Sequence, residues 1–395
     1  MKELSRIAEA VQASTTMAID AMFKQMKADG IDVIGFGAGE PDFDTPDEIK
    51  AAGIAAIESN LTRYTPAAGT VELRQAVCDR MKIDCGLEYV PSQVVVSSGA
   101  KHIVYLALRV LVNPGDEVIL PAPFWVSYYE LIRMAGGVPV VVTATEAEDF
   151  KLSAEKLAAA ITPRTKALIL NNPSNPTGMM YGREELEAIA KVCVENELYV
   201  ISDEIYYGLV YDGKSFTSFA ALSPEAKEQT ILVNGVSKSY AMTGWRIGYL
   251  VAPEPGYIKK MAQLQEGVAS CVSTFTQAAA VEALKSTACV DQMVADYTRR
   301  RDILVDGLNA IPGITCKKSA GSFYAFPNIK AFGKTSQAFA EELLENAGVV
   351  TVPGSAFGDM GEGYLRLVFA NSDENLKEAV RRIADYVARA YPGIK

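Results

Sequence analysis

The sequence predicts an α/β fold, with a mostly parallel sheet in a large domain and a smaller α+β domain beside it. Seven short runs rich in β-branched residues lie between residues 94 and 251, and longer amphipathic segments separate several of them. Most of these runs are apolar throughout, as in strands buried on both faces of a parallel sheet. From about residue 290 the pattern changes to one long helical segment followed by short strands with helices between them.

Composition and charge narrow the class of protein. The chain has 395 residues, 49% apolar and 22% charged, which suits two globular domains and excludes disordered, collagenous and coiled-coil proteins. The net charge of −10 disfavours a nucleic-acid partner. No apolar stretch approaches the roughly 18 residues of a membrane span, and the N-terminus lacks the apolar core of a secretory signal. We therefore expect no membrane association and a cytoplasmic location.

The cysteines and the single histidine indicate a reduced cytosolic protein without a metal site. The six cysteines are scattered without a C-x-x-C pair, which is typical of a reduced cytosolic protein. His102 is the only histidine, so a multi-histidine metal site is impossible, and we expect no bound metal. It stands at the start of an apolar helix-like run, where an ordinary helix-surface or core histidine is the simplest interpretation.

Residues 1–44 hold one helical segment and a short strand at Val33–Phe36, too little to bury a core, so we expect them to join the C-terminal part. The large domain is predicted over residues 45–289. Thr45-Pro46-Asp47-Glu48 has the pattern of a capping box that starts a helix through about Ser59. The predicted strands that follow are Val94–Ser97, Glu117–Leu120, Val138–Thr143, Ala167–Leu170, Tyr199–Ser202, Ile231–Asn234 and Ile247–Val251. The predicted helices between them are Lys101–Val112, Trp125–Ala135, Ala154–Ile161 and Arg183–Glu195.

The small domain is predicted over residues 290–395. It begins with a long helix at about Val290–Ala310, and Ser372 has the position of an N-cap for a last helix that runs to about Ala390. The short strands between these helices are predicted near Phe323–Phe326, Val349–Val352 and Tyr364–Phe369.

Small and polar residues follow successive strands, where the functional sites of open α/β sheets lie. Ser98-Gly99-Ala100-Lys101 opens a helix whose backbone N–H groups could bind a phosphate. Trp125 could stack on a planar ring. Asn175 lies in a loop dense in turn residues. Each pattern also has an ordinary explanation, as a plain turn, a core tryptophan or a simple loop.

Charged residues follow the next two strands. Asp203 ends a buried strand, which is unfavourable unless a cation meets it. Lys238 follows another, where a lowered pKa would make it an amine nucleophile, although most lysines are solvated. Arg246 comes eight residues later. Together, an amine, an acid, an aromatic ring and a phosphate site meet the needs of pyridoxal phosphate.

At this point the sequence resembles the fold-type I aminotransferases of class I/II, and within them the bacterial aspartate aminotransferase group. The resemblance extends from Ser5 to about Tyr391. Its motifs are Gly39-Glu40-Pro41-Asp42-Phe43, Tyr64-Thr65-Pro66-Ala67-Ala68-Gly69, Asn175-Pro176-Thr177-Gly178, Ser202-Asp203-Glu204-Ile205-Tyr206, Ser237-Lys238, Gly244-Trp245-Arg246-Ile247-Gly248 and Tyr364-Leu365-Arg366.

The resemblance implies pyridoxal 5′-phosphate (PLP) as cofactor and assigns it a set of residues. Lys238 attaches the cofactor and shuttles the proton, and Asp203 pairs with the ring nitrogen. Asn175 and Tyr206 bond the ring hydroxyl, and Trp125 stacks on the ring. The residues implied around the phosphate are Gly99, Ala100, Lys101, Ser237 and Arg246, with Tyr64 reaching in from a partner subunit. The protein is therefore expected to be a homodimer with shared active sites.

The implied reaction is transfer of an amino group between an L-amino acid, most specifically aspartate, and 2-oxoglutarate by a ping-pong mechanism. Arg366 binds the substrate α-carboxylate beside Gly39, Trp125 and Asn175, and Lys101 stands where the group places a cation for the distal carboxylate. Gln12 stands where the group often has a lysine associated with prephenate, which argues against that substrate.

The sequence leaves one alternative open and argues against two others. An aminotransferase for alanine or aromatic amino acids, or a β-lyase on the same scaffold, would share every cofactor residue. A non-catalytic PLP-binding regulator module would carry a fused DNA-binding domain, for which the first family motif at Gly39 leaves no room. A nicotinamide-dependent dehydrogenase would show a G-x-G-x-x-G motif after an early strand, and none is present.

Overall fold

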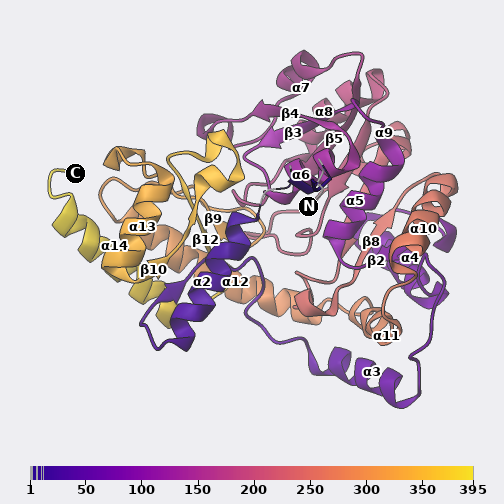
Figure 1. Ribbon diagram of the computed structural model, residues 1–395, viewed down its shortest axis with the longest axis horizontal. Helices are drawn as coiled ribbons and strands as arrows, with labels where there is room; N and C mark the ends of the chain where they lie inside the picture. The colour runs from indigo at the N-terminus through magenta and orange to yellow at the C-terminus, as the bar shows by residue number, and fades with distance from the viewer. Residues whose placement is uncertain (1–2, 6–7, 10, 12, 395) are drawn as a thin grey trace.

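A seven-stranded sheet forms the centre of the computed structural model, which describes residues 3–5, 8–9, 11 and 13–394 (Figure 1). The strand order is β2-β8-β7-β6-β5-β3-β4. Neighbours from β7 to β4 are parallel, whereas β8 is antiparallel to both β2 and β7. The predicted α/β class with a mostly parallel sheet is confirmed. The strands are β2 (Val94–Ser97), β3 (Glu117–Ala122), β4 (Val138–Thr143), β5 (Thr165–Asn171), β6 (Tyr199–Asp203), β7 (Thr230–Gly235) and β8 (Gly248–Val251).

Both faces of this sheet are covered by helices. Along β3, Val118 and Leu120 pack in one apolar cluster with α5 and α6, while Ile119 packs in another with α8. Alternate strand residues therefore enter different cores, which explains why the strand runs are apolar without alternation. The helices of this part are α3 (Asp47–Glu58), α4 (Val71–Cys85), α5 (Ala100–Leu111), α6 (Ser127–Ala135), α7 (Ala154–Ala160), α8 (Arg183–Glu195), α9 (Pro224–Gln229), α10 (Pro255–Ala269) and α11 (Thr274–Ala283).

The C-terminal part forms a second lobe, at the left in Figure 1. Its helices are α12 (Ala288–Asn309), α13 (Ser336–Ala347) and α14 (Asp373–Ala390), and its strands are β9 (Tyr324–Ala325), β10 (Val349–Val350), β11 (Val352–Pro353) and β12 (Leu365–Val368). The N-terminal segment contributes α2 (Thr15–Ala28) and β1 (Ile34–Gly35), and β1 pairs in parallel with β10.

Two local predictions need correction. Thr45 does not cap α3: its hydroxyl donates to Ala241 O at 2.6 Å and accepts from Trp245 Nε1 at 3.1 Å, and Pro46 takes the cap position. The predicted strand Val349–Val352 is two strands, because β10 pairs with β1 while β11 pairs with β12. The predicted cap at Ser372 is confirmed, since its Oγ accepts from Asn375 N at 3.2 Å.

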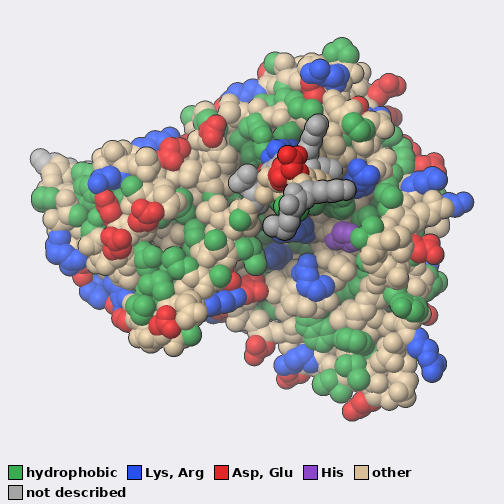
Figure 2. Space-filling view, viewed as in Figure 1, with side chains coloured by type: hydrophobic (Ala, Val, Ile, Leu, Met, Phe, Trp, Pro, Cys, Tyr) green, Lys and Arg blue, Asp and Glu red, His purple; other side chains and the backbone are tan. Residues whose placement is uncertain are grey.

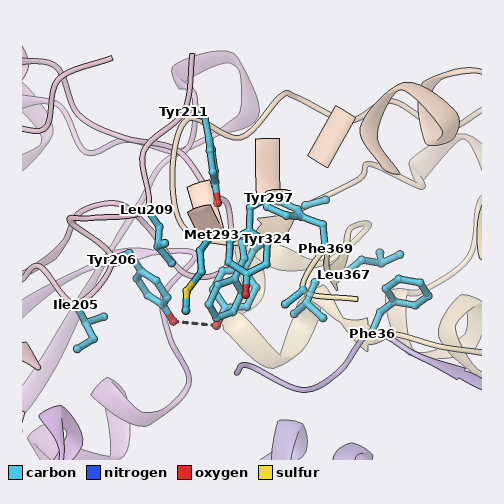
Figure 3. Close-up of a cluster of buried hydrophobic side chains, with 14 of the residues drawn as sticks. Phe36, Ile205, Tyr206, Leu209, Tyr211, Met293, Tyr297, Tyr324, Leu367 and Phe369 are labelled. Atoms are coloured by element: carbon cyan, nitrogen blue, oxygen red, sulfur yellow. Dashed lines mark hydrogen bonds between the residues drawn. The ribbon is translucent and has the colours of Figure 1, made fainter. Parts of the chain in front are cut away.

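An aromatic core joins the two lobes behind the carboxyl ends of the strands (Figure 3). Tyr206 comes from the segment after β6, Tyr324 from β9 and Tyr297 from α12, and all are buried in one cluster. This packing holds residues distant in sequence at a common edge of the sheet. No helix in the described part of the chain is long and apolar enough to cross a bilayer.

Candidate active site

A cavity of about 450 Å³ lies at the carboxyl ends of β5, β6 and β7. Its other wall is formed by α2 and residues 37–40. Figure 2 shows this face hollowed between the two lobes, with Lys and Arg side chains in the hollow. Eleven of the residues proposed from the sequence line it: Gly39, Ala100, Lys101, Trp125, Asn175, Asp203, Tyr206, Ser237, Lys238, Arg246 and Arg366.

Lys238 follows β7 and brings an amine into this cavity. Its Nζ donates a hydrogen bond to Gly39 O at 2.5 Å and lies 5.9 Å from the centre of the Phe323 ring. Burial lowers the pKa of Lys238 to about 8, with Glu40 opposing this and Arg366 reinforcing it. A fraction of the amine is therefore uncharged near neutral pH and able to act as a nucleophile or base.

Asp203, at the end of β6, is the buried acid of the cavity. Tyr128 donates its hydroxyl to Asp203 Oδ2 at 2.5 Å, and Ile205 N donates to Oδ1 at 3.2 Å. Burial raises the pKa of Asp203 to about 6, while these hydrogen bonds and the Lys238 charge oppose the rise. Such a carboxylate favours a cationic partner.

Tyr128 was missed by sequence reasoning, although a signal was available. It lies on α6, three residues after Trp125, and the two rings meet edge to face with centroids 5.1 Å apart. Residues at i and i+3 share one side of a helix, so an aromatic residue at this spacing could have been placed beside Trp125.

A hydroxyl network connects the next two predicted residues. The hydroxyls of Tyr206 and Tyr324 lie 2.8 Å apart (Figure 3), and Asn175 Nδ2 donates to Tyr324 at 3.4 Å. Burial raises the pKa of Tyr206 well above its ordinary value, so this phenol stays neutral. Tyr324 was also missed, since an aromatic residue in a short strand looks like core.

Arg366 on β12 faces the same cavity from the second lobe. Its Nη2 donates to Gly37 O at 2.6 Å and its Nη1 to Asn175 Oδ1 at 3.3 Å. The guanidinium carbon lies 4.7 Å from the ring centre of Tyr324 and 5.0 Å from that of Phe357. The side chain is 2% exposed, yet its Nε has no hydrogen-bond partner among the described residues. A planar carboxylate would satisfy such a donor.

The N-terminus of α5 forms the opposite corner. Gly99 has a φ of +86°, and a Cβ at this position would collide with the Arg246 guanidinium. Arg246 donates from Nη2 to Ser98 O at 3.1 Å and from Nη1 to Thr243 O at 2.8 Å. A glycine-opened helix start with an arginine across it is a site for an anion such as phosphate. Gly99 itself is outside the cavity lining but forms the turn behind it.

Lys101 and Tyr64 are two proposed site residues that lie at the surface. Lys101 is exposed over the residue as a whole, and its Nζ lies 5.0 Å from the centre of the Trp125 ring. The amine itself is partly desolvated, which lowers its pKa, and the nearby Arg246 charge lowers it further. Tyr64 is 89% exposed and borders a groove beside residues 271–275 rather than the cavity. Within this one chain it does not reach Lys238. Gln12 lies outside the described residues.

Other cavity residues had no sequence signal. Ser14, Thr16, Asp20 and Lys24 come from the segment of α2, and Lys24 Nζ pairs with Asp20 Oδ2 at 2.7 Å.

His102 is half-buried, with Nδ1 2.5 Å from Ser97 Oγ. In the described ranges, no group of His, Cys, Asp and Glu side chains could hold a metal ion.

Comparison with known proteins agrees with this geometry. The model of the family "Aminotransferase class I and II" matches residues 31–383. The chain belongs to the class I and II aminotransferases. This aminotransferase is 47% identical to a probable aspartate/prephenate aminotransferase of Aquifex aeolicus, covering 94% of this chain and 95% of that protein. It is 46% identical to an aspartate aminotransferase of Bacillus sp. strain YM-2, covering 98% and 100%.

Solved structures match the aminotransferase over nearly its whole length. The crystal structure of the aspartate aminotransferase from Rhizobium meliloti has a TM-score of 0.94 at 40% identity, covering 98% of this chain and 100% of that one. That of the Thermus thermophilus aspartate aminotransferase with maleate has a TM-score of 0.93 at 40% identity, with the same coverage. An aromatic aminotransferase from Pyrococcus horikoshii OT3 matches with a TM-score of 0.88 at 40% identity, covering 93% and 99%.

Proposed function

We propose that this aminotransferase uses PLP to move the amino group of aspartate to 2-oxoglutarate. The observation that carries the proposal is that Lys238, Asp203 and Arg366 line one cavity. Lys238 has an amine of lowered pKa, Asp203 is a buried acid, and Arg366 has a free Nε donor.

The residues present fit PLP in three respects. The Gly99 turn, the start of α5 and Arg246 provide a cradle for the phosphate. Asp203 offers a buried carboxylate to the ring nitrogen. Lys238 supplies the amine that attaches the aldehyde. Ala100, Lys101, Ser237, Trp125, Asn175 and Tyr206 complete the proposed cofactor set.

Bound PLP would supply an aldehyde that condenses with amino groups and a ring that accepts the electrons left when a Cα proton departs. The chain's own residues do the rest. Arg366 binds the substrate α-carboxylate through its free Nε, with Gly39 and Asn175 beside it. Lys238 Nζ takes the proton from the substrate Cα and delivers it to the cofactor. In the second half of the reaction it moves a proton in the opposite direction. Because donor and acceptor use one site in turn, the kinetics are ping-pong.

Preference for aspartate is supported by Lys101, whose Nζ lies 5.0 Å from the centre of the Trp125 ring, where it could meet a second carboxylate. Relatives named as aspartate aminotransferases support the same substrate, and the Thermus protein was solved with maleate, a four-carbon dicarboxylate. A second candidate, an aminotransferase for aromatic donors, is favoured by the match to the Pyrococcus protein.

Assembly and location follow as part of the same proposal. Tyr64, exposed here, is proposed to reach the phosphate of a partner subunit in a homodimer with shared sites. Pairing of β1 with β10 supports a small domain of residues 1–44 and 290–395 beside a large domain of residues 45–289. The acidic charge and unpaired cysteines support a cytoplasmic enzyme without a nucleic-acid or membrane partner.

A panel of amino donors against 2-oxoglutarate tests the function. We expect oxaloacetate from aspartate at a kcat/KM at least tenfold above that for alanine, phenylalanine or tyrosine. A higher value for an aromatic donor would replace the substrate and keep the aminotransferase. Amino transfer with none of these donors would refute the proposal.

A further inference from the structure

Glu204 is a buried carboxyl directly after Asp203, on the side of the sheet away from the cavity. Asp203 lines the cavity, whereas Glu204 points to the rear, as expected for successive residues at a strand end. Oε1 of Glu204 accepts hydrogen bonds from Ser202 Oγ at 2.9 Å, Ser218 Oγ at 3.0 Å and Phe219 N at 3.0 Å. The side chain is 1% exposed. The reaction described above gives it no role.

The surroundings of Glu204 provide hydrogen bonds but no direct counter-charge. None of the ion pairs in the described residues includes it. Burial raises its pKa to about 7, the three hydrogen bonds oppose the rise, and the Asp203 charge adds to it. Cys85 and Tyr89 interact with it electrostatically from neighbouring elements, and burial keeps both neutral. Cys85 interacts in turn with the ion pair of Arg80 and Asp84.

We propose that Glu204 is a positioning residue for the cofactor: it anchors the Asp203 turn from behind, and its charge strengthens the hold of Asp203 on a protonated ring nitrogen. The proposal rests on the proposed function, because the PLP ring is the cation in question. Two carboxylates on adjacent buried residues repel each other. A cationic ring against Asp203 relieves this repulsion, so ring binding and ionisation of Glu204 favour one another.

This coupling is reciprocal and sets a direction with pH. Below about pH 7 Glu204 is neutral and adds nothing to ring binding. As the pH rises through 7, Glu204 loses its proton and the affinity for a cationic ring increases. Glu204→Gln keeps an acceptor oxygen for Ser202, Ser218 and Phe219 but cannot ionise, so it separates the charge from the anchoring.

The test is equilibrium binding of pyridoxamine 5′-phosphate, which needs no covalent bond to Lys238, between pH 5.5 and 8.5. We expect the ratio of dissociation constants, Glu204→Gln over wild type, to be near one at pH 5.5 and at least threefold at pH 8.5. Glu117→Gln is the control, since Glu117 is buried at the opposite, amino end of β3. Its ratio should not change with pH.

A second variant protects the test if Glu204→Gln folds poorly. Ser218→Ala removes a donor that stabilises the charged carboxylate, so the inflection in cofactor affinity should move to higher pH. A flat ratio for Glu204→Gln, or an unmoved inflection for Ser218→Ala, overturns the inference while the function stands. Failure of the wild-type protein to bind pyridoxamine 5′-phosphate at every pH refutes the proposed function and this inference together.

Discussion

The hydroxyl of Tyr128 donates a hydrogen bond of 2.5 Å to Oδ2 of Asp203, and both side chains are buried. Asp203 alone would be a carboxyl that burial drives toward its neutral form. The Tyr128 hydrogen bond favours the ionised form and fixes one oxygen, while Oδ1 accepts, among the described residues, a hydrogen bond only from Ile205 N. Tyr128 therefore prepares the acid to meet a cation.

Replacing Tyr128 with phenylalanine should raise the pKa of Asp203 above its value of about 6, because a hydrogen bond to the charged form is lost. The pH below which cofactor affinity falls should then be higher than in wild type. Affinity at pH 7 should fall about tenfold, as for a lost hydrogen bond to a charged group. Titration with pyridoxamine 5′-phosphate measures both. Tyr129→Phe, on the exposed side of α6, is the control and should match wild type.

Asp203→Asn should leave the cofactor attached but slow removal of the Cα proton by more than about a hundredfold. An amide cannot hold the ring nitrogen protonated, and the neutral ring is a poorer acceptor of electrons. Single-turnover kinetics with aspartate measure this step. A loss below about tenfold, or roughly 1.4 kcal/mol of barrier, would contradict the role assigned to Asp203.

Two arginines in the cavity should give different phenotypes. Arg366→Ala should keep the cofactor and raise KM for every amino acid, because its Nε is the free donor for the α-carboxylate. Arg366→Lys should also bind poorly, since an ammonium lacks the planar fork. Arg246→Ala should instead weaken cofactor retention at the start of α5. Cofactor titration and KM values for two unlike donors distinguish them, and exchanged phenotypes would mean that the two sites are reversed.

Lys101→Ala should lower the kcat/KM ratio of aspartate to alanine at least tenfold. A second carboxylate in a closed site needs a fixed positive charge, and Lys101 is the cation beside Trp125. Alanine, which has no distal carboxylate, is the internal control and should be turned over as in wild type. An unchanged ratio would point to Lys24, which lines the same cavity but is paired with Asp20.

Much of this architecture could be predicted because each strand of the large sheet is a compact apolar run. The bounds of β2 and β4 agree with those read from the sequence, as do those of α8. Because the end of each apolar run is also visible in the sequence, the residues directly after the strands could be identified as candidate site residues. Lys238, Asp203 and Asn175 are of this kind.

The misses at Tyr324 and Thr45 have a common physical cause, unlike that at Tyr128, for which a local spacing was available. Tyr324 reaches Asn175 and Tyr206 only because β9 of the second lobe is packed against the segment after β6. Thr45 was expected to cap its own helix, but Ala241 O offers its hydroxyl a partner nearly 200 residues away. Long-range packing of this kind decides which hydrogen bond forms, and no local pattern encodes it.

The central claim is that Lys238 is the amine that attaches PLP, and borohydride reduction tests it most directly. Reduction of the PLP-loaded protein makes the attachment permanent, and peptide mass mapping locates it. We expect the pyridoxyl mass on Lys238, in a yellow protein that loses its colour on reduction, and no stable attachment in Lys238→Ala. A pyridoxyl mass on Lys101 or any other lysine, or undiminished attachment in Lys238→Ala, would contradict the account.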